Sequence, residues 1–227
     1  MARQLTFDLG HEPALGRDDY LVSPANALAL AMLDQPQAWP QGRMLLIGPE
    51  GAGKTHLAAI WTADHDAACL PGRALDIAAA DALAVPEGAV VIEDADGVAG
   101  LAGPEQALFH LWNLSAARGC RLLLTARGPV RDWGLSLPDL TSRMAATPAI
   151  RIEAPDEALL AAVLVKLLAD RQLSAPAGLI DWLTLRMDRD LGLARRLVAV
   201  LDAEMMAERR PLTRGLAGDL LERLSGV

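Results

Sequence analysis

Gly48-Pro49-Glu50-Gly51-Ala52-Gly53-Lys54-Thr55 is the stretch of sequence that decides the fold. It follows a short apolar run, residues 42–47, and its lysine begins a segment with helical period. Its last two glycines permit backbone conformations that a β-carbon forbids, so that successive N–H groups can turn toward a phosphate. The lysine would bridge the terminal phosphates, and the helix N-terminus adds its positive end. The order strand, glycine loop, helix therefore predicts a phosphate-binding loop.

We expect an ATP or ADP site built from this loop and the first turn of the following helix. Its predicted residues are Gly48, Gly51, Ala52, Gly53, Lys54, Thr55 and His56. Such a loop needs an acidic partner on a neighbouring strand. The apolar run 88–92 ends in Glu93 and Asp94, with one further apolar run, residues 74–78, between loop and acids in the sequence. We predict that Glu93 and Asp94, with the hydroxyl of Thr55, hold Mg²⁺ or position water; the alternative is an ordinary strand end.

The rest of the chain alternates in a way that is typical of an α/β fold. Predicted strands occupy residues 42–47, 74–78, 89–92, 121–125 and 149–152. Helical stretches, notably residues 104–118, lie between them, as a parallel sheet with helical crossovers requires. A first helix is expected from Ser23, with Pro24 in its first turn. The sequence thus predicts a parallel sheet with flanking helices.

After Pro155 the pattern becomes helical throughout. The predicted helices cover residues 156–171, 176–187, 191–208 and 212–224, with no strand between them. We therefore expect three parts: a flexible arm, residues 1–18; an α/β nucleotide-binding core, residues 19–154; and a small all-helical lid, residues 155–227.

Composition narrows the class of protein. The chain of 227 residues is 52% hydrophobic and 22% charged, which is enough to build a core. Its 29 acidic and 21 basic residues give a net charge of −8, which repels a phosphate backbone, so no direct specific DNA binding is expected. Cys69 and Cys120 lack the spacing of a metal site or a disulfide framework. Without a basic and apolar leader or an apolar run of about 18 residues, a cytoplasmic protein with no membrane partner is expected.

Several motifs, taken in order, resemble the bacterial replication initiator DnaA and its AAA+ core. The resemblance begins at Gly53-Lys-Thr-His-Leu57 and Val90-Val-Ile-Glu-Asp94. Residues 19–26 are similar to the linker that packs near the adenine in that family, and residues 122–127 fall at its sensor-1 strand. Residues 140–143 resemble the box that carries the arginine finger. The segment Ala194-Arg195-Arg196-Leu197 resembles the sensor-2 helix.

The resemblance implies a role for individual residues. Arg143 would insert its guanidinium toward the γ-phosphate held by a neighbouring subunit. Arg195 would reach the phosphates of its own nucleotide, although the adjacent Arg196 leaves that register open. Tyr20 and Leu21, in the linker, would contact the nucleotide base. The alternatives are a surface salt bridge for Arg143 and a solvated position for Arg195.

Three departures from the DnaA pattern change the expected activity. The first acid of the strand is Glu93 instead of aspartate, and Arg127 stands where the family places a polar or acidic sensor-1 residue. No DNA-binding domain follows the lid before Val227. We therefore expect slow or no intrinsic ATP hydrolysis and stable ADP binding.

The arm carries a short motif of its own. Gln4-Leu5-Thr6-Phe7-Asp8-Leu9 resembles the peptide with which Hda-type regulators, DnaA-related proteins that inactivate the initiator, bind the DNA polymerase sliding clamp. Gln4 could hydrogen-bond through both amide ends while Leu5, Phe7 and Leu9 fill an apolar groove. The alternative is a hydrophobic staple onto the protein's own core.

These resemblances together imply a regulator with two protein partners, the sliding clamp and DnaA. It would promote ATP hydrolysis on DnaA and so prevent re-initiation, and it could form a homodimer or a larger homo-oligomer. Two alternatives stay open: a P-loop ATPase that acts as a helicase loader or remodelling factor, which would need competent hydrolysis, and a nucleotide-gated scaffold without hydrolysis.

Overall fold

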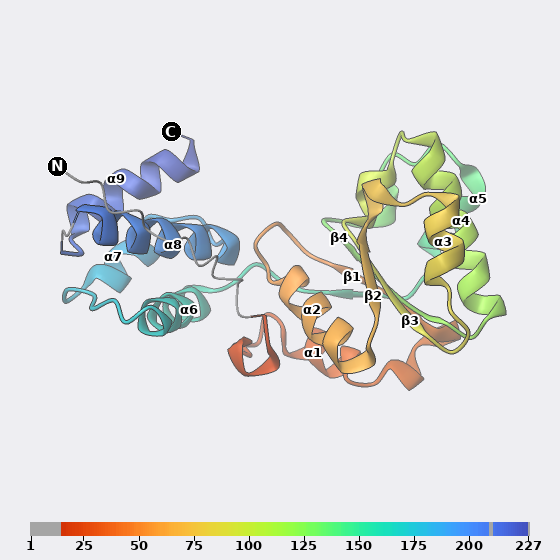
Figure 1. Ribbon diagram of the computed structural model, residues 1–227, viewed down its shortest axis with the longest axis horizontal. Helices are drawn as coiled ribbons and strands as arrows, with labels where there is room; N and C mark the ends of the chain where they lie inside the picture. The colour runs from red at the N-terminus through yellow and green to blue at the C-terminus, as the bar shows by residue number, and fades with distance from the viewer. Residues whose placement is uncertain (1–14, 209–210, 227) are drawn as a thin grey trace. The chain divides into compact units, whose positions relative to one another are not determined.

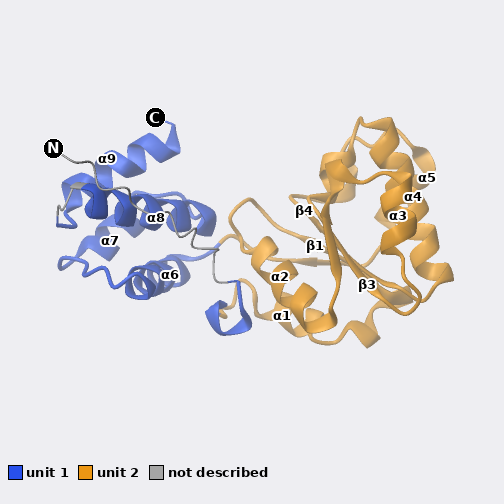
Figure 2. Cartoon of the chain, in the orientation of Figure 1, with its two compact units in different colours: residues 1–21, 155–227 blue, residues 22–154 orange. Residues whose placement is uncertain are grey.

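The computed structural model describes residues 15–208 and 211–226, which form two compact units (Figure 2). One unit spans residues 22–154, and the other contains the residues from Pro155 onward together with the segment that ends at Leu21. Residues 19–21, which were predicted to belong to the α/β core, therefore group with the helices. The reason is local, because Leu21 packs against the helical unit's apolar cluster and Asp19 pairs with Lys166 at 2.7 Å.

The larger unit is built on a five-stranded parallel sheet (Figure 1). Its strands are β1 (Arg43–Ile47), β2 (Ala68–Pro71), β3 (Ala89–Glu93), β4 (Arg121–Ala126) and β5 (Ala149–Arg151). The order across the sheet is β2-β3-β4-β1-β5. The expected α/β class with a parallel sheet is confirmed, and β4, late in the sequence, lies between the loop-bearing β1 and the acid-bearing β3.

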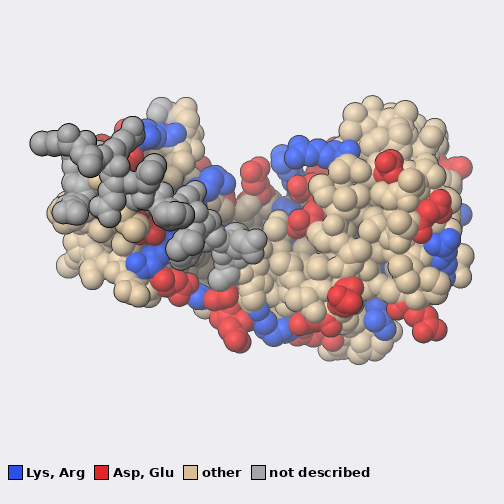
Figure 3. Space-filling model, viewed as in Figure 1, with Lys and Arg blue, Asp and Glu red and all other residues tan. Residues whose placement is uncertain are grey.

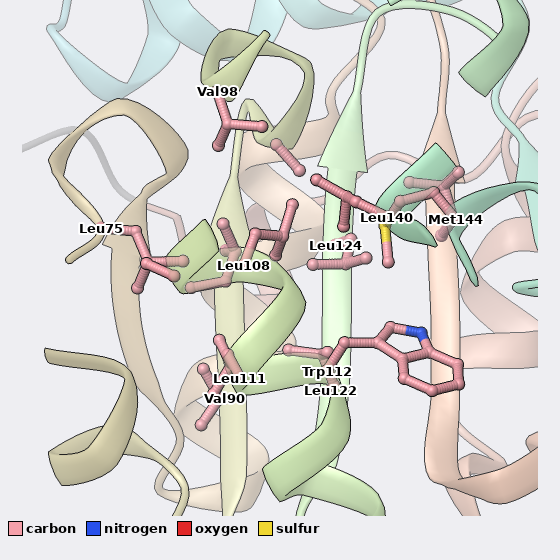
Figure 4. Packing of buried hydrophobic residues seen from close by; sticks show 14 of the residues in the cluster. Leu75, Val90, Val98, Leu108, Leu111, Trp112, Leu122, Leu124, Leu140 and Met144 are labelled. Carbon is pink, nitrogen blue, oxygen red and sulfur yellow. The ribbon is translucent and has the colours of Figure 1, made fainter. Parts of the chain in front are cut away.

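Helices cover both faces of this sheet (Figure 1). They are α1 (Ala27–Leu33), α2 (Lys54–His65), α3 (Ile77–Leu83), α4 (Ala102–Ala117) and α5 (Pro138–Ala145). The helices α3, α4 and α5 pack on one face, where Leu108, Leu111 and Met144 meet Val90 and Leu124 of the strands (Figure 4). The helices α1 and α2 lie on the other face, so the sheet is buried on both sides, as parallel sheets are.

The prediction of a strand at residues 74–78 is wrong. The second strand is β2, at Ala68–Pro71, and residues 77–83 form α3 instead. Asp76 accepts a hydrogen bond from the Ala79 N–H at 2.7 Å and so caps α3. An N-cap followed by alanines favours helix over strand, because alanine has the highest helix propensity and is depleted in strands. Pro71 is tolerated in β2 because β2 lies at the sheet edge.

The smaller unit is helical, as predicted, and its second helix covers residues 179–184 instead of the predicted 176–187. Its helices are α6 (Glu157–Asp170), α7 (Leu179–Thr184), α8 (Leu191–Glu208) and α9 (Arg214–Ser225). Side-chain caps start three of them, since Asp156 accepts from the Leu159 N–H, Asp190 from the Gly192 and Leu193 N–H groups, and Thr213 from the Leu216 N–H. Their apolar sides enclose a leucine-rich cluster. No helix in the described part of the chain is long and apolar enough to span a bilayer.

Glu105, in the first turn of α4, ties together the loops that lead into α4 and α5. It is buried, and its carboxylate accepts backbone N–H groups of Gly100 at 2.8 Å, Ser136 at 3.0 Å and Leu137 at 2.9 Å. Burial raises the pKa of this carboxyl, but the hydrogen bonds from Ser136, Gly100 and Leu137 outweigh it, so the pKa lies below its ordinary value. The charged form of Glu105 therefore stabilises the entry to α5.

We expect Glu105→Gln to lower the free energy of unfolding by about 2 to 4 kcal/mol at neutral pH, because an amide cannot accept from all three N–H groups. A carboxyl with a lowered folded pKa stabilises the protein above its unfolded pKa of about 4.3, and this contribution is lost as the pH falls further. Urea unfolding should therefore show a difference between wild type and variant that is constant from pH 6 to 8 and shrinks below about pH 4. Glu157→Gln, an exposed glutamate in the first turn of α6, is the matched control. Equal stability of wild type and Glu105→Gln at neutral pH would contradict this assignment.

Candidate phosphate-binding site

The loop between β1 and α2 has backbone requirements that only glycine meets. Gly48 donates its N–H to the Ala126 carbonyl at 3.2 Å, and a β-carbon at Gly48 would lie 2.7 Å from the Ile152 carbonyl oxygen. Gly53 has φ of 101°, in the left-handed region, directly before the first turn of α2. Gly48 thus lies between the ends of β4 and β5, and Gly53 leads directly into the N-terminus of α2.

Lys54 is the buried cation of the loop. It is 8% exposed, and its Nζ donates to the carbonyls of Gly48 and Pro49, both at 2.8 Å. Burial lowers the pKa of Lys54, and the nearby carboxylates of Asp94 and Asp96 oppose that shift. A phosphate group at the loop would replace the two carbonyls as acceptors and give the ammonium a charged partner.

Glu93, at the end of β3, hydrogen-bonds with the hydroxyl-bearing side chain of Thr55 at the start of α2. Burial raises the pKa of Glu93, which the bond to Thr55 and the charge of Lys54 partly oppose. Its Oε1 atom is buried and has no hydrogen-bond partner among the described residues. A carboxylate with one buried unsatisfied oxygen beside a threonine hydroxyl fits Mg²⁺, which takes one or two protein oxygens together with phosphate oxygens.

A second group of polar residues surrounds the loop from β3 and β4. The Asp94 N–H donates to Thr125 Oγ1 at 3.0 Å, and the Arg127 N–H donates to Asp96 Oδ2 at 3.3 Å. The Arg127 guanidinium lies 3.9 Å from the Glu50 carboxylate, with both side chains largely exposed. Arg127 is close enough to Lys54 to lower its pKa. Arg127 therefore brings positive charge to the phosphate loop.

Sequence reasoning missed Asp96 and Thr125. Asp96 Oδ1 is buried without a hydrogen-bond partner among the described residues, and its charge acts on Lys54. The sequence signal for Asp96 is a third acid, two residues after Asp94. Thr125 contacts Asp94 only because β4 lies beside β3, a pairing that the sequence order of the strands does not reveal.

Arg143 lies away from this site. It is exposed on α5, with its Cζ 4.7 Å from the centroid of the Trp112 ring. The Arg43 Cζ lies 3.5 Å from the same ring, and Arg43 is the first residue of β1. Ile47, at the other end of β1, lies four residues or about 13 Å further along the strand, and the phosphate loop follows it. Arg143 therefore lies near the N-terminal ends of the strands, whereas the phosphate loop of its own chain follows the C-terminal end of β1.

The other predicted nucleotide contacts belong to the helical unit. Tyr20 is largely buried, which raises the pKa of its hydroxyl, while the charge of Arg195 lowers it. Arg195 is half-buried near Asp19 and Tyr20, whereas Arg196 is exposed and pairs with Asp190 at 3.7 Å. The predicted clamp-binding residues lie outside the described part of the chain: Gln4, Leu5, Phe7 and Leu9.

Comparison of the sequence with family models gave no match, and comparison with curated proteins gave none either. Solved structures do match. Domain III of the Thermotoga maritima replication initiation protein DnaA is 17% identical, with a TM-score of 0.76 over 94% of this chain and 98% of that chain. AMPPCP-bound DnaA from Aquifex aeolicus is 15% identical, with a TM-score of 0.66 over 87% and 67%. The AAA domain of FIGL-1 in complex with ADP is 14% identical, with a TM-score of 0.66 over 92% and 83%.

The fold and the loop define the class: this chain has the AAA+ fold, with a glycine-rich loop between the first strand of a parallel sheet and the following helix, and with a further helical unit. Its fold is that of domain III of DnaA over nearly the whole length of both chains. Likeness at these identities concerns the fold, and the residues of the site must carry the function.

Proposed function

We propose that this protein is a DnaA-related AAA+ regulator that binds ATP or ADP at the Gly48–Thr55 loop and promotes ATP hydrolysis on a bound DnaA protomer. The arm would bind the DNA polymerase sliding clamp through Gln4, Leu5, Phe7 and Leu9. Arg143 would supply the cation that stabilises the transition state on the partner's nucleotide. DnaA left with ADP would then be unable to start another round of replication.

The position of Arg143 is the observation that carries this proposal. An exposed arginine at the sheet edge opposite the phosphate loop is too far from the nucleotide of its own chain, whereas it is available to a nucleotide held by a second protein. Among the described residues no ion pair engages Arg143. A guanidinium without a carboxylate partner is the group that a triphosphate attracts, because its planar fork matches phosphate oxygens.

The nucleotide of this chain would act as a switch. Lys54 would contact the phosphates, and Thr55 and Glu93 would hold Mg²⁺, whose chemistry when bound is to neutralise charge on the phosphate oxygens. A site that positions attacking water needs an ionised acid. Here the pKa of Glu93 is raised and Arg127 adds positive charge, so the two residues differ from that arrangement. These features support slow turnover and a long-lived bound nucleotide. Arg195, with Tyr20 and Leu21 in the same helical unit, would respond to which nucleotide is bound.

Charge distribution supports protein partners over DNA. On the face drawn in Figure 3, acidic and basic side chains are interspersed. In the helical unit several arginines pair with acids: Arg171 with Asp202 at 3.7 Å, Arg196 with Asp190 at 3.7 Å, and Arg223 with Glu204 at 3.6 Å. Paired charges offer a phosphate backbone few free cations, and the net charge of −8 adds repulsion. A cytoplasmic protein recruited to DNA through the clamp fits this pattern.

Two other functions are separated from this one by their requirements. A helicase loader or remodelling ATPase would need vigorous hydrolysis at Lys54 and Glu93 and would work without the clamp. A nucleotide-gated scaffold would assemble with DnaA but leave its hydrolysis rate unchanged. Measuring hydrolysis of DnaA-bound ATP with this protein, loaded clamp and DNA, and then leaving out each component in turn, distinguishes the three.

The arm has its own test. We expect wild-type protein to be retained on immobilised sliding clamp, and the double variant Gln4→Ala/Leu5→Ala to lose at least about 10-fold in affinity, because it removes an amide contact and an apolar anchor. The same variant should lose clamp-dependent stimulation of DnaA while binding nucleotide normally. The double variant Arg17→Ala/Asp18→Ala, at exposed positions outside the motif, is the control. Equal retention of wild type and the Gln4/Leu5 variant would remove the clamp from the proposal.

A further inference from the structure

Two arginines from distant parts of the chain share one tryptophan ring. The guanidinium carbons of Arg43, at the start of β1, and Arg143, on α5, lie 3.5 Å and 4.7 Å from the centroid of Trp112 on α4. Trp112 is buried, and Figure 4 shows it at one end of the apolar cluster. Positive groups over an indole face are attracted by its quadrupole, and indole is the strongest of the aromatic partners.

Arg43 fixes the ring from below the protein surface. It is 1% exposed, and its guanidinium donates to the Trp112 carbonyl at 2.8 Å, to Ser115 Oγ at 3.2 Å and to Gln41 Oε1 at 2.8 Å. All three acceptors are neutral, and no described ion pair involves Arg43. Burial lowers the pKa of Arg43, and the charge of Arg143 lowers it further. The buried arginine therefore locks the turn of α4 that carries Trp112, without a carboxylate to cancel its charge.

Thr147 links the same ring to the helix that carries Arg143. The Trp112 Nε1–H donates to Thr147 Oγ1 at 3.3 Å, and the Thr147 hydroxyl donates to the Arg143 carbonyl at 2.9 Å. Thr147 is itself buried. The indole thus holds Arg143 at two points, the guanidinium through the ring face and the backbone through Thr147.

We propose that Trp112, held by Arg43 and Thr147, is the positioning residue that presents the Arg143 guanidinium to the triphosphate of a partner protein. This inference rests on the proposed function. The ring restricts the guanidinium to one surface, which reduces the conformational freedom that binding would otherwise have to remove. The second positive charge, buried and uncompensated, leaves the pair with an excess of positive potential that favours an incoming anion. A carboxylate beside Arg143 would neutralise the charge of its guanidinium within the chain, and none of the described residues forms such an ion pair.

The test compares substitutions at Trp112 and Thr147 in the same assay of DnaA-bound ATP hydrolysis, with the full chain, clamp and DNA. Trp112→Phe keeps an aromatic face and should retain stimulation within about 3-fold. Trp112→Leu should lower the maximal stimulated rate by about 10- to 100-fold, because a small misplacement of a reacting group has effects of this size. The concentration that gives half the maximal effect should change little, since Arg143 is argued to act on the transition state. Adding Trp112→Leu to Arg143→Ala should cause no further loss.

Trp112→Leu could also weaken the core, so a nearly isosteric change keeps the inference testable. Thr147→Val removes the hydroxyl link and leaves the buried Trp112 Nε1–H without its acceptor, so a fall of a few degrees in the melting temperature is expected. In the folded variant the maximal rate should fall by about 3- to 10-fold with unchanged nucleotide affinity. A second readout is the Arg143 side-chain NMR signal, assigned by its absence in Arg143→Lys. It should show an upfield ring-current shift in wild type and Trp112→Phe that disappears in a folded Trp112→Leu.

These outcomes distinguish failure of the positioning role from failure of the proposed function. If Arg143→Ala abolishes stimulation while Trp112→Leu and Thr147→Val behave as wild type, the positioning role is wrong and the proposed function stands. If the Arg143 signal has no ring-current shift, the positioning role is wrong as well. If Arg143→Ala itself leaves stimulation intact, it is the proposed function that fails.

Discussion

Replacing Lys54 by alanine should reduce the affinity for ATP and ADP by about 100- to 1,000-fold. The ammonium is the buried cation of the phosphate loop, and its Nζ already lies within hydrogen-bond distance of two loop carbonyls at 2.8 Å. A charge-assisted hydrogen bond to phosphate contributes about 1.5 to 3 kcal/mol, and Lys54 is placed to make more than one. Two such bonds at the lower end of this range correspond to about 3 to 4 kcal/mol, or two to three decades in the dissociation constant.

Isothermal titration calorimetry with ATP and ADP in the presence of Mg²⁺ measures this effect. The sequence contains one other lysine, Lys166, which pairs with Asp19 at 2.7 Å and Asp170 at 2.9 Å in the helical unit. Lys166→Ala is therefore a matched removal of one ammonium, and we expect its nucleotide affinity to stay within about 3-fold of wild type. Unchanged binding by Lys54→Ala would show that the loop does not hold a nucleotide, and the proposed switch would fall with it.

The second large effect is expected at Arg143. Arg143→Ala should lower the stimulated hydrolysis of DnaA-bound ATP by about 1,000-fold, toward the rate of DnaA alone, since arginines supplied to a neighbour's phosphoryl transfer have effects of 10³ or more. The affinity of the variant protein for ATP and ADP should not change, because the arginine lies at the opposite end of β1 from the loop. Arg143→Lys should recover little, because a lysine cannot present the planar fork.

Single-turnover hydrolysis of DnaA-bound ATP is the appropriate measurement, with clamp and DNA present. Arg131→Ala is the control, since Arg131 is an exposed arginine of the same unit and, among the described residues, pairs with its neighbour Asp132 at 3.7 Å. Full stimulation by Arg143→Ala would exclude the arginine from the reaction. Equal losses in Arg131→Ala and Arg143→Ala would point to a general electrostatic effect instead of a positioned group.

Prediction from sequence succeeded where the determinants are local. The phosphate loop was recognisable because its geometry depends on glycines and a helix start within eight residues. Four of the five strands were placed because apolar runs bounded by polar residues and glycine are typical of buried strands. The run 74–78 misled because a series of alanines carries no strong period, and the Asp76 cap decided for a helix.

The site was only partly predictable for a related reason. Thr55 and Glu93 were expected to meet, and they do, because parallel strands end at the same edge of the sheet. Asp96 and Thr125 were missed because their contacts depend on which strands are neighbours. The contact of Arg43 and Arg143 with the Trp112 ring was equally hidden. Arg43 and Arg143 are 69 and 31 positions from Trp112 in the chain, and no local pattern relates them.

By itself, the sequence determined the glycine-rich loop between a strand and a helix, the α/β character of the larger unit and the helical character of the smaller one, because glycine conformations, caps and hydrophobic periods act over one or two turns of chain. The tertiary structure alone decided that β4 separates the loop strand from the acid strand, that one buried Glu93 oxygen has no partner among the described residues, and that Arg143 lies at the opposite end of the strands from its own phosphate loop. Those features come from strand order and long-range packing, which bring together side chains that the sequence keeps apart.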